Sequence, residues 1–158
     1  MSEFRPSLLL IEGVFYKDIA DELMAGAIAA IEEAGATFER ITVPGALEIP
    51  QALTAVVRAG QTPYGPPTWR FHGAVALGCV IRGETSHYDI VAGESARALM
   101  DIAVNYGVPV GNGILTVENR EQAIKRASRE GGNKGASAVR ACLELINVFM
   151  ERHAYRPR

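Results

Sequence analysis

The sequence predicts an α/β fold in which a four-stranded parallel sheet is covered by helices on both faces. Short apolar runs alternate with longer amphipathic segments four times along the 158 residues, and one more helix follows. This alternation is typical of parallel strands joined by crossover helices. The run 74–81 is apolar apart from one glycine, as in a strand buried on both sides. Because no linker or change in composition divides the chain, we expect a single domain over residues 1–158.

The first half of the chain contains two strand–helix units. The expected elements, in chain order, are a strand at 8–11, a helix at 19–34, a strand at 38–43 and a helix at 48–59. Asp18 is the expected cap of the first helix, and Gly35 ends it. The turn Pro44-Gly45-Ala46 precedes the second helix, which tolerates Pro50 because this proline falls in its first turn.

The second half begins with a proline-rich surface loop at 61–71. The expected elements after it are a strand at 73–81, a helix at about 89–105, a strand at 108–115, a short helix up to about residue 127 and a last helix from 136 to about 152. Asn119 and Gln122 have the spacing of a capping box. Gly111 and Gly113 indicate a place where another backbone or a ligand comes close. The last helix carries a narrow apolar seam, formed by Ala136, Val139, Leu143, Ile146 and Met150.

Composition excludes several functional classes. The net charge is −2 and no basic run is present, which argues against a nucleic acid or an anionic membrane as the main partner. No apolar run approaches the ~20 residues that span a bilayer. The apolar run near the N-terminus is too short for a secretory signal, so we expect a cytoplasmic protein. Cys79 and Cys142 lack metal-ligand spacing and are expected to be small buried residues.

The stretch 73–91 combines a strand, a polar loop and a titratable side chain. The carboxyl ends of parallel strands are where ligands bind in such sheets, and free N–H groups at the following helix start attract anions. His87 lies between the strand and the expected helix, where an imidazole can take and give protons. An inert surface histidine is an equally good interpretation from position alone. The segment Gly83–Ser86 suits a phosphate, although an ordinary turn is the simpler interpretation.

Other candidates fall on the same edge of the expected sheet. Phe15 follows the first strand and could stack on a planar heterocycle, although a core residue is favoured when it is taken singly. Glu48 follows the second strand and could accept from ligand hydroxyls or amines, or merely stabilise a helix N-terminus. Arg126 and Lys134 flank a glycine-rich break and could hold a phosphate, although solvated charges are the simpler interpretation. Together these signals indicate a small polar phosphorylated ligand and proton transfer, with no metal site and no nucleotide fingerprint.

Four sequence motifs together resemble those of a known protein family. They are residues 43–50 (VPGALEIP), 78–89 (GCVIRGETSHYD), 113–119 (GILTVEN) with Gln122-Ala123 following, and 132–135 (GNKG). In this order and spacing they resemble the 6,7-dimethyl-8-ribityllumazine synthase family over nearly the whole chain, from Leu8 to the last helix. The resemblance implies a flavodoxin-like three-layer αβα sandwich with a four-stranded parallel sheet.

The family's reaction is the penultimate step of riboflavin biosynthesis. It condenses 5-amino-6-(D-ribitylamino)uracil with 3,4-dihydroxy-2-butanone 4-phosphate through imine formation, phosphate elimination, tautomerisation and ring closure. The resemblance implies a transferase that needs no metal and no cofactor, because holding two reactants together and moving protons is most of the task. It also implies small-molecule substrates and a homopentamer whose active sites lie at subunit interfaces.

The resemblance assigns roles residue by residue. His87 resembles the family's proton-transfer histidine, and Phe15 resembles the aromatic residue that stacks on the pyrimidine. The other positions assigned to the ribitylaminouracil are Ala46, Leu47, Glu48, Cys79, Val80, Ile81 and Asn112. The positions assigned to the phosphate are Glu84, Thr85, Arg126 and Lys134. The resemblance implies that the neighbouring subunit contributes Asn112 and Arg126 to the active site.

Three features depart from the family pattern. Asn112 stands where many members carry a phenylalanine, so ring stacking is expected to be weaker or one-sided. Residues 61–71 resemble an insertion of several residues, remote from the motifs. Little chain precedes Leu8 to add a strand to a neighbour, so a pentamer is expected rather than a larger shell. Two alternatives stay open: a catalytically weak flavin- or lumazine-binding paralogue, and a ring-forming scaffold.

Overall fold

The computed structural model describes residues 4–157. Within these residues four strands form one parallel sheet in the order β2-β1-β3-β4. The strands are β1 (Ser7–Gly13), β2 (Thr37–Val43), β3 (Gly73–Ile81) and β4 (Val110–Val117). The central strands β1 and β3 are buried on both faces almost throughout, which explains their continuous apolar sequences. The predicted four-stranded parallel sheet is confirmed.

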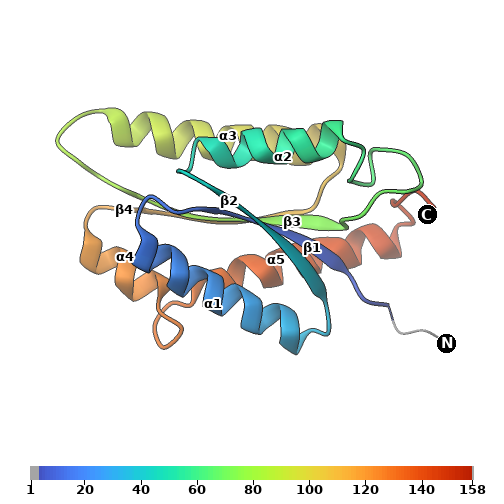
Figure 1. Cartoon of the computed structure of the whole chain (residues 1–158), viewed down its shortest axis with the longest axis horizontal. Coiled ribbons are helices and arrows are strands. Elements are labelled where there is room, and N and C mark those ends of the chain that lie inside the picture. Colours follow the sequence, from blue (N-terminus) through green and yellow to red (C-terminus); the bar gives the residue numbers. More distant parts are fainter. Residues whose placement is uncertain (1–3, 158) are drawn as a thin grey trace.

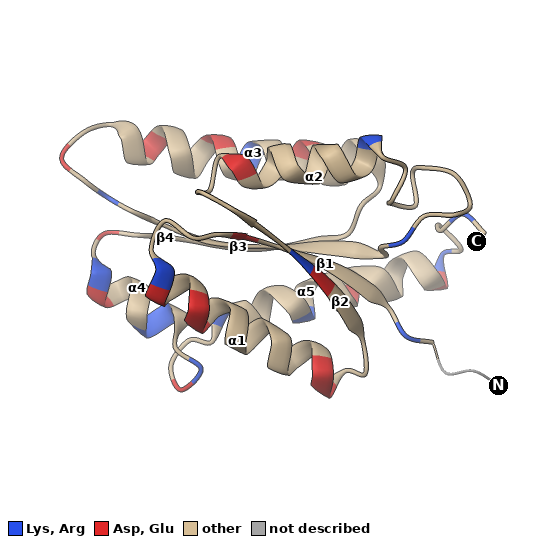
Figure 2. Cartoon of the chain, in the orientation of Figure 1, with Lys and Arg blue, Asp and Glu red and all other residues tan. Residues whose placement is uncertain are grey.

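Helices cover both faces of the sheet, which confirms the predicted three-layer arrangement (Figure 1). α2 (Glu48–Arg58) and α3 (His87–Tyr106) lie on one face, and α1 (Lys17–Glu33), α4 (Arg120–Ala127) and α5 (Lys134–Glu151) lie on the other. Two apolar clusters fill the spaces between the layers, one on each side of the sheet. Acidic and basic residues are interspersed along the helices of both layers (Figure 2). No helix among residues 4–157 is both long and apolar enough to cross a membrane.

Glycines allow α5 to approach its neighbours closely. A Cβ atom on Gly111 of β4 would lie 2.0 Å from the carbonyl oxygen of Ala138. A Cβ atom on Gly135 would lie 2.1 Å from the carbonyl oxygen of Leu23 in α1. No side chain fits in either space, so these glycines let α5 dock on the sheet and on α1. The close backbone approach predicted at Gly111 is confirmed.

The caps of two helices differ in how well the sequence predicted them. The Asn119 side chain accepts a hydrogen bond of 2.9 Å from the Gln122 N–H, so the predicted cap of α4 is confirmed. The predicted cap of α1 is wrong, because this helix begins at Lys17 and Asp18 lies inside its first turn. There the Asp18 carboxylate pairs with Arg120 of α4, an interaction between residues far apart in sequence that has no local signal.

Other boundaries and faces also differ from the prediction. α3 begins at His87 instead of Asp89, and α5 begins at Lys134 instead of Ala136. Met150 does not belong to the buried seam of α5, because it is 39% exposed beside the C-terminal tail. Ile90, an apolar residue in the first turns of α3, is 54% exposed.

The loop 61–71 is anchored more firmly than a surface loop is expected to be. Trp69 is 4% exposed, and its indole N–H donates to the carbonyl of Arg156 at 3.1 Å. Tyr155 donates from its hydroxyl to the carbonyl of His72 at 3.1 Å. These bonds fasten the C-terminal tail to the loop and to the residue before β3, where the aromatic rings of Trp69, His72 and Tyr155 pack together. The end of the insertion-like loop, with Trp69 and Phe71, is therefore part of the core at the amino ends of the strands.

Candidate active site

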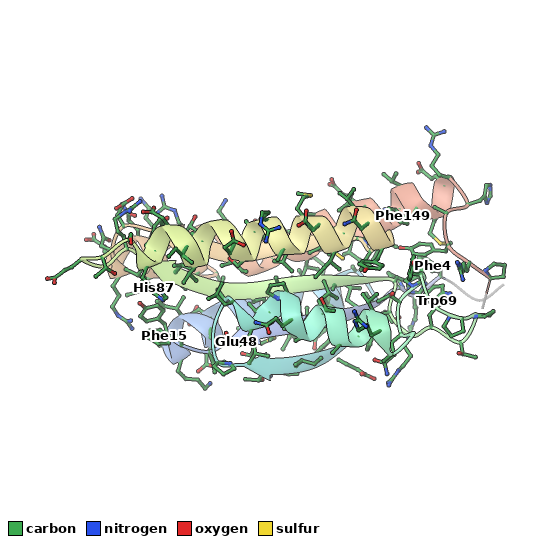
Figure 3. All side chains as sticks on the ribbon, turned by 90° about the horizontal axis from the view of Figure 1, so that it is seen from above. Phe4, Phe15, Glu48, Trp69, His87 and Phe149 are labelled. Atoms are coloured by element: carbon green, nitrogen blue, oxygen red, sulfur yellow. The ribbon has the colours of Figure 1, made fainter. Side chains whose placement is uncertain are left out.

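A cavity of about 350 Å³ opens at the carboxyl ends of the strands, where ligands bind in parallel α/β sheets. Figure 3 shows Phe15, Glu48 and His87 at this end of the molecule, and Phe4, Trp69 and Phe149 at the opposite end. The lining residues come from the end of β3, from the loops after β1, β2 and β3 and from the starts of α1, α2 and α3. They are Phe15, Tyr16, Gly45, Ala46, Leu47, Glu48, Cys79, Val80, Ile81, Gly83, Thr85, His87, Tyr88 and Val91.

The loops after β1 and β2 are brought together by close backbone packing. The N–H of Val14 donates to the carbonyl of Val43 at 3.0 Å, which extends the pairing of the two strands into the loops. A Cβ atom on Gly13 would lie 2.9 Å from the carbonyl carbon of Gly45, so only glycine permits this approach. The contact brings the loop that carries Phe15 next to the 44–48 turn, and residues of both line the cavity.

Phe15 presents its ring to the cavity. The side chain is 75% exposed, and its ring meets the Tyr16 ring edge-on at a centroid distance of 4.9 Å. The interpretation of Phe15 as a core residue is therefore wrong. An exposed aromatic face at a cavity mouth suits stacking on a planar heterocycle.

The loop after β3 carries the candidate phosphate and proton-transfer groups. The N–H of His87 donates to the Thr85 hydroxyl at 3.3 Å, and His87 is the first residue of α3, exposed at the cavity. A Cβ atom on Gly83 would meet nothing within 4 Å, so the loop leaves open space beside the helix start. Unpaired N–H groups at a helix N-terminus favour anions, and the loop therefore suits a phosphate.

The side chain of Arg82 connects the loop after β3 to Glu118 and to the first turn of α3. Its Nε donates to Glu118 at 2.8 Å, and its Nη1 donates to Asp89 at 3.4 Å. The guanidinium carbon lies 4.1 Å from the ring centroid of Tyr88, which lines the cavity. Arg82 thus contacts both the end of β4 and the first turn of α3.

Cys79 lines the cavity at the end of β3, but its chemistry is that of a neutral thiol. Burial raises the pKa of Cys79 to about 11, and the nearby Arg120 offsets this rise only in part. A thiol with such a pKa stays protonated near neutral pH and is a poor nucleophile. The expectation of a small buried residue is confirmed for Cys142 and is wrong for Cys79, which is only partly buried.

A buried carboxylate at the end of β1, outside the described cavity lining, was missed by the sequence analysis. Glu12 of β1 is 1% exposed, and its Oε2 accepts hydrogen bonds from Arg40 at 3.0 Å and from the Thr42 hydroxyl at 3.1 Å. Glu12 is the last residue but one of β1, immediately before the loop that carries Phe15. The available signal was a single charged residue at the end of an otherwise apolar strand.

Four of the predicted site residues lie outside the lining of the cavity. Glu84 is exposed in the loop after β3, and Lys134 is the exposed first residue of α5. Arg126 is exposed on α4 and donates to the carbonyl of its own helix at Gln122. Asn112 lies on the edge strand β4, where it lines a separate groove of about 430 Å³ between α3 and α5. Among the described lining residues of the active-site cavity none is a lysine or an arginine.

The sequence analysis also missed several residues that the structure places in the cavity. They are Tyr16, Gly45, Tyr88 and Val91. Tyr16, Gly45 and Tyr88 each adjoin a predicted site residue, so proximity in sequence was the available signal. Within residues 4–157 no group of three or more His, Cys, Asp or Glu side chains is placed to hold a metal ion.

Comparison with known proteins identifies the family. The family model described as 6,7-dimethyl-8-ribityllumazine synthase matches residues 5–150. A protein of that name from Methylorubrum populi is 57% identical over 141 residues, which cover 89% of this chain and 81% of the relative. One from Agrobacterium fabrum is 55% identical over 144 residues, which cover 91% of this chain and 95% of the relative. A third, named 6,7-dimethyl-8-ribityllumazine synthase 1, from Rhizobium meliloti, is 52% identical over 149 residues, covering 94% and 95%. The chain therefore belongs to the 6,7-dimethyl-8-ribityllumazine synthase family.

Proposed function

We propose that this chain is a transferase that makes 6,7-dimethyl-8-ribityllumazine from 5-amino-6-(D-ribitylamino)uracil and 3,4-dihydroxy-2-butanone 4-phosphate. The observation that carries the proposal is the meeting of two distant motifs, residues 43–50 and 78–89, in one cavity with Phe15. Both substrates are small and polar, and the cavity offers an aromatic face, a carboxylate, an imidazole and a helix start. The chain acts as one domain in the cytoplasm.

Within the cavity each residue has a distinct task. Phe15 stacks on the pyrimidine ring, and Glu48 accepts hydrogen bonds from the ribitylaminouracil. The backbone at Cys79, Val80 and Ile81 contacts the uracil edge, with Ala46 and Leu47 beside it. His87 transfers protons during imine formation and phosphate elimination, since it lies at the cavity beside the phosphate loop. Holding both reactants in one place supplies much of the rate enhancement.

The phosphate needs a cation that the described cavity lining of one subunit does not contain. We propose that a neighbouring copy supplies Arg126, together with Asn112, in a homopentamer. The groove along β4 supports this proposal, because β4 is an edge strand and Met100 and Val104 beside it are 63% and 71% exposed. Exposed apolar surface of this kind favours association between subunits. Glu84, Thr85 and Lys134 complete the proposed phosphate site.

The test is to mix the purified chain with both substrates and to follow the absorbance and fluorescence of the lumazine. We expect lumazine to form together with an equal amount of inorganic phosphate. A protein that binds riboflavin or lumazine without forming either product would be the catalytically weak paralogue. Ring assembly with neither binding nor turnover would indicate the scaffold.

A further inference from the structure

Arg82 is held at its backbone by the sheet. It directly follows β3, and its N–H donates to the carbonyl of Val117 at 2.9 Å, which continues the pairing of β3 with β4. Its side chain is 40% exposed. The backbone of Arg82 is therefore fixed to the sheet, and its guanidinium lies between the residue that follows β4 and the first turn of α3.

Three groups surround the guanidinium, and two of them lie in the same helical turn as His87. Glu118 accepts from Nε at 2.8 Å and Asp89 accepts from Nη1 at 3.4 Å. The ring of Tyr88 lies against the guanidinium carbon at 4.1 Å. Tyr88 and Asp89 are the second and third residues of α3, directly after His87. Planar geometry lets one arginine bind carboxylates and stack on a ring simultaneously.

The first turn of α3 has few other attachments. Its cap residue, Ser86, has a helical backbone conformation and makes no side-chain cap hydrogen bond. The N–H of His87 has only the long 3.3 Å bond to the Thr85 hydroxyl. A helix end without a cap frays readily. The Arg82 contacts replace the missing cap by fastening the turn to the end of β4.

We propose that Arg82 is a positioning residue that holds the first turn of α3 so that the His87 imidazole stays at the cavity. The inference rests on the proposed function, in which His87 transfers protons. Arg82 acts through His87 and does not itself contact the substrate. Ion pairs of an exposed arginine contribute little to stability. Removing Arg82 is therefore expected to displace His87 more than it lowers the free energy of unfolding.

The test compares Arg82→Met with a matched control, Arg97→Met. Arg97 lies on α3 and pairs with two carboxylates, Glu94 and Asp101, but does not line the cavity. Both variants lose two exposed ion pairs and are expected to fold with similar thermal midpoints. Arg82→Met is expected to lower kcat by about tenfold to a hundredfold, because small displacements of catalytic groups are costly. Arg97→Met is expected to leave kcat unchanged, and Arg82→Lys to recover part of the loss.

A double-mutant cycle shows whether Arg82 acts through His87. In a His87→Ala background, Arg82→Met is expected to cause no further loss of kcat, because the imidazole to be positioned is gone. A further loss as large as in the wild type would overturn the inference. So would an increase in KM for the phosphorylated substrate alone, which would indicate direct phosphate contact.

A crystal structure of Arg82→Met separates this inference from the proposed function. The His87 ring is expected to be displaced from the cavity in Arg82→Met and to keep its place in Arg97→Met. An unmoved ring would overturn the inference even if the wild type makes lumazine. If the wild type makes none, the proposed function fails, and the position of the ring still decides the role of Arg82.

Discussion

The Nε of Arg40 on β2 donates a 3.0 Å hydrogen bond to the carboxylate of Glu12 on β1, and Glu12 is 1% exposed. A second bond from the Arg40 Nη2 reaches the same oxygen, Oε2. The other oxygen, Oε1, is buried and has no hydrogen-bond partner among the described residues. The pair thus joins the edge strand to the centre of the sheet immediately before the loops that carry Phe15 and Glu48.

Arg40→Met is expected to destabilise the protein, because it leaves a buried carboxylate without its cation. Removing one partner of a fully buried pair costs about 3–5 kcal/mol, and we expect about 2–3 kcal/mol here because the Arg40 side chain is 47% exposed. Urea unfolding measures this change. In the double variant Glu12→Gln/Arg40→Met, the Glu12→Gln substitution removes the buried charge and should recover part of the lost stability. A double variant as unstable as Arg40→Met would contradict the account.

His87→Ala is expected to lower kcat substantially without changing the unfolding midpoint, because His87 is exposed at the start of α3 and supports no core contact. General acid–base groups typically contribute about 10²–10⁴-fold to the rate. Steady-state kinetics with both substrates measure the effect. His153→Asn is the control, since His153 is exposed at the opposite end of the molecule and its positive φ of 55° suits asparagine. Equal kcat values for the two variants would exclude a catalytic role for His87.

Arg126→Ala is expected to raise KM for the phosphorylated substrate with little effect on KM for the ribitylaminouracil. A charge-assisted hydrogen bond to phosphate is typically worth about 1.5–3 kcal/mol, or roughly tenfold to a hundredfold in affinity. Lys125→Ala is the matched control, because Lys125 is the neighbouring cation on α4 and is also exposed. If both variants change KM for the phosphorylated substrate equally, the change comes from the loss of positive charge on the surface, and Arg126 has no specific role in binding the phosphate.

Cys79 is expected to react slowly with iodoacetamide in the native protein. Because burial raises its pKa to about 11, the thiolate fraction at pH 8.5 should be about fiftyfold to a hundredfold lower than in the unfolded chain. Mass spectrometry of the alkylated peptide follows the rate, with the urea-unfolded chain as reference. The folded-state pKa lies above the unfolded value near 9, so this thiol contributes stability in full below pH 9. That contribution is lost as the pH rises from 9 to about 11. Equal rates in the native and unfolded chains would contradict the assigned environment.

The sheet and the centre of the site followed from local sequence patterns. Apolar runs of strand length and their alternation with amphipathic segments predicted the four parallel strands, since burial on both faces dictates such sequences. The motif residues Glu48 and His87 fell on the cavity because both follow strands in a parallel sheet. Asn119 was recognisable as a cap because its partner lies only three residues away.

Interactions between distant residues could not be predicted in this way. Asp18 was assigned as a cap, but it pairs with Arg120 across the α1–α4 contact. The burial of Trp69 depends on the C-terminal tail, which the proline-rich pattern of its own loop does not reveal. The exposed Arg126 and Asn112 lie outside the described cavity lining, and their proposed roles depend on a second copy of the chain.

The shared cavity is tested most directly by combining two variants with different defects in one assembly. His87→Ala and Arg126→Ala subunits are unfolded together in equal amounts, refolded as a mixture and assayed for lumazine formation, with the phosphorylated substrate well below the KM of Arg126→Ala. If His87 of one subunit works with Arg126 of its neighbour, random mixing in a ring restores about a quarter of the sites. Activity well above that of either variant alone is the predicted result. A mixed assembly no more active than the separate variants would show that His87 and Arg126 do not meet between subunits.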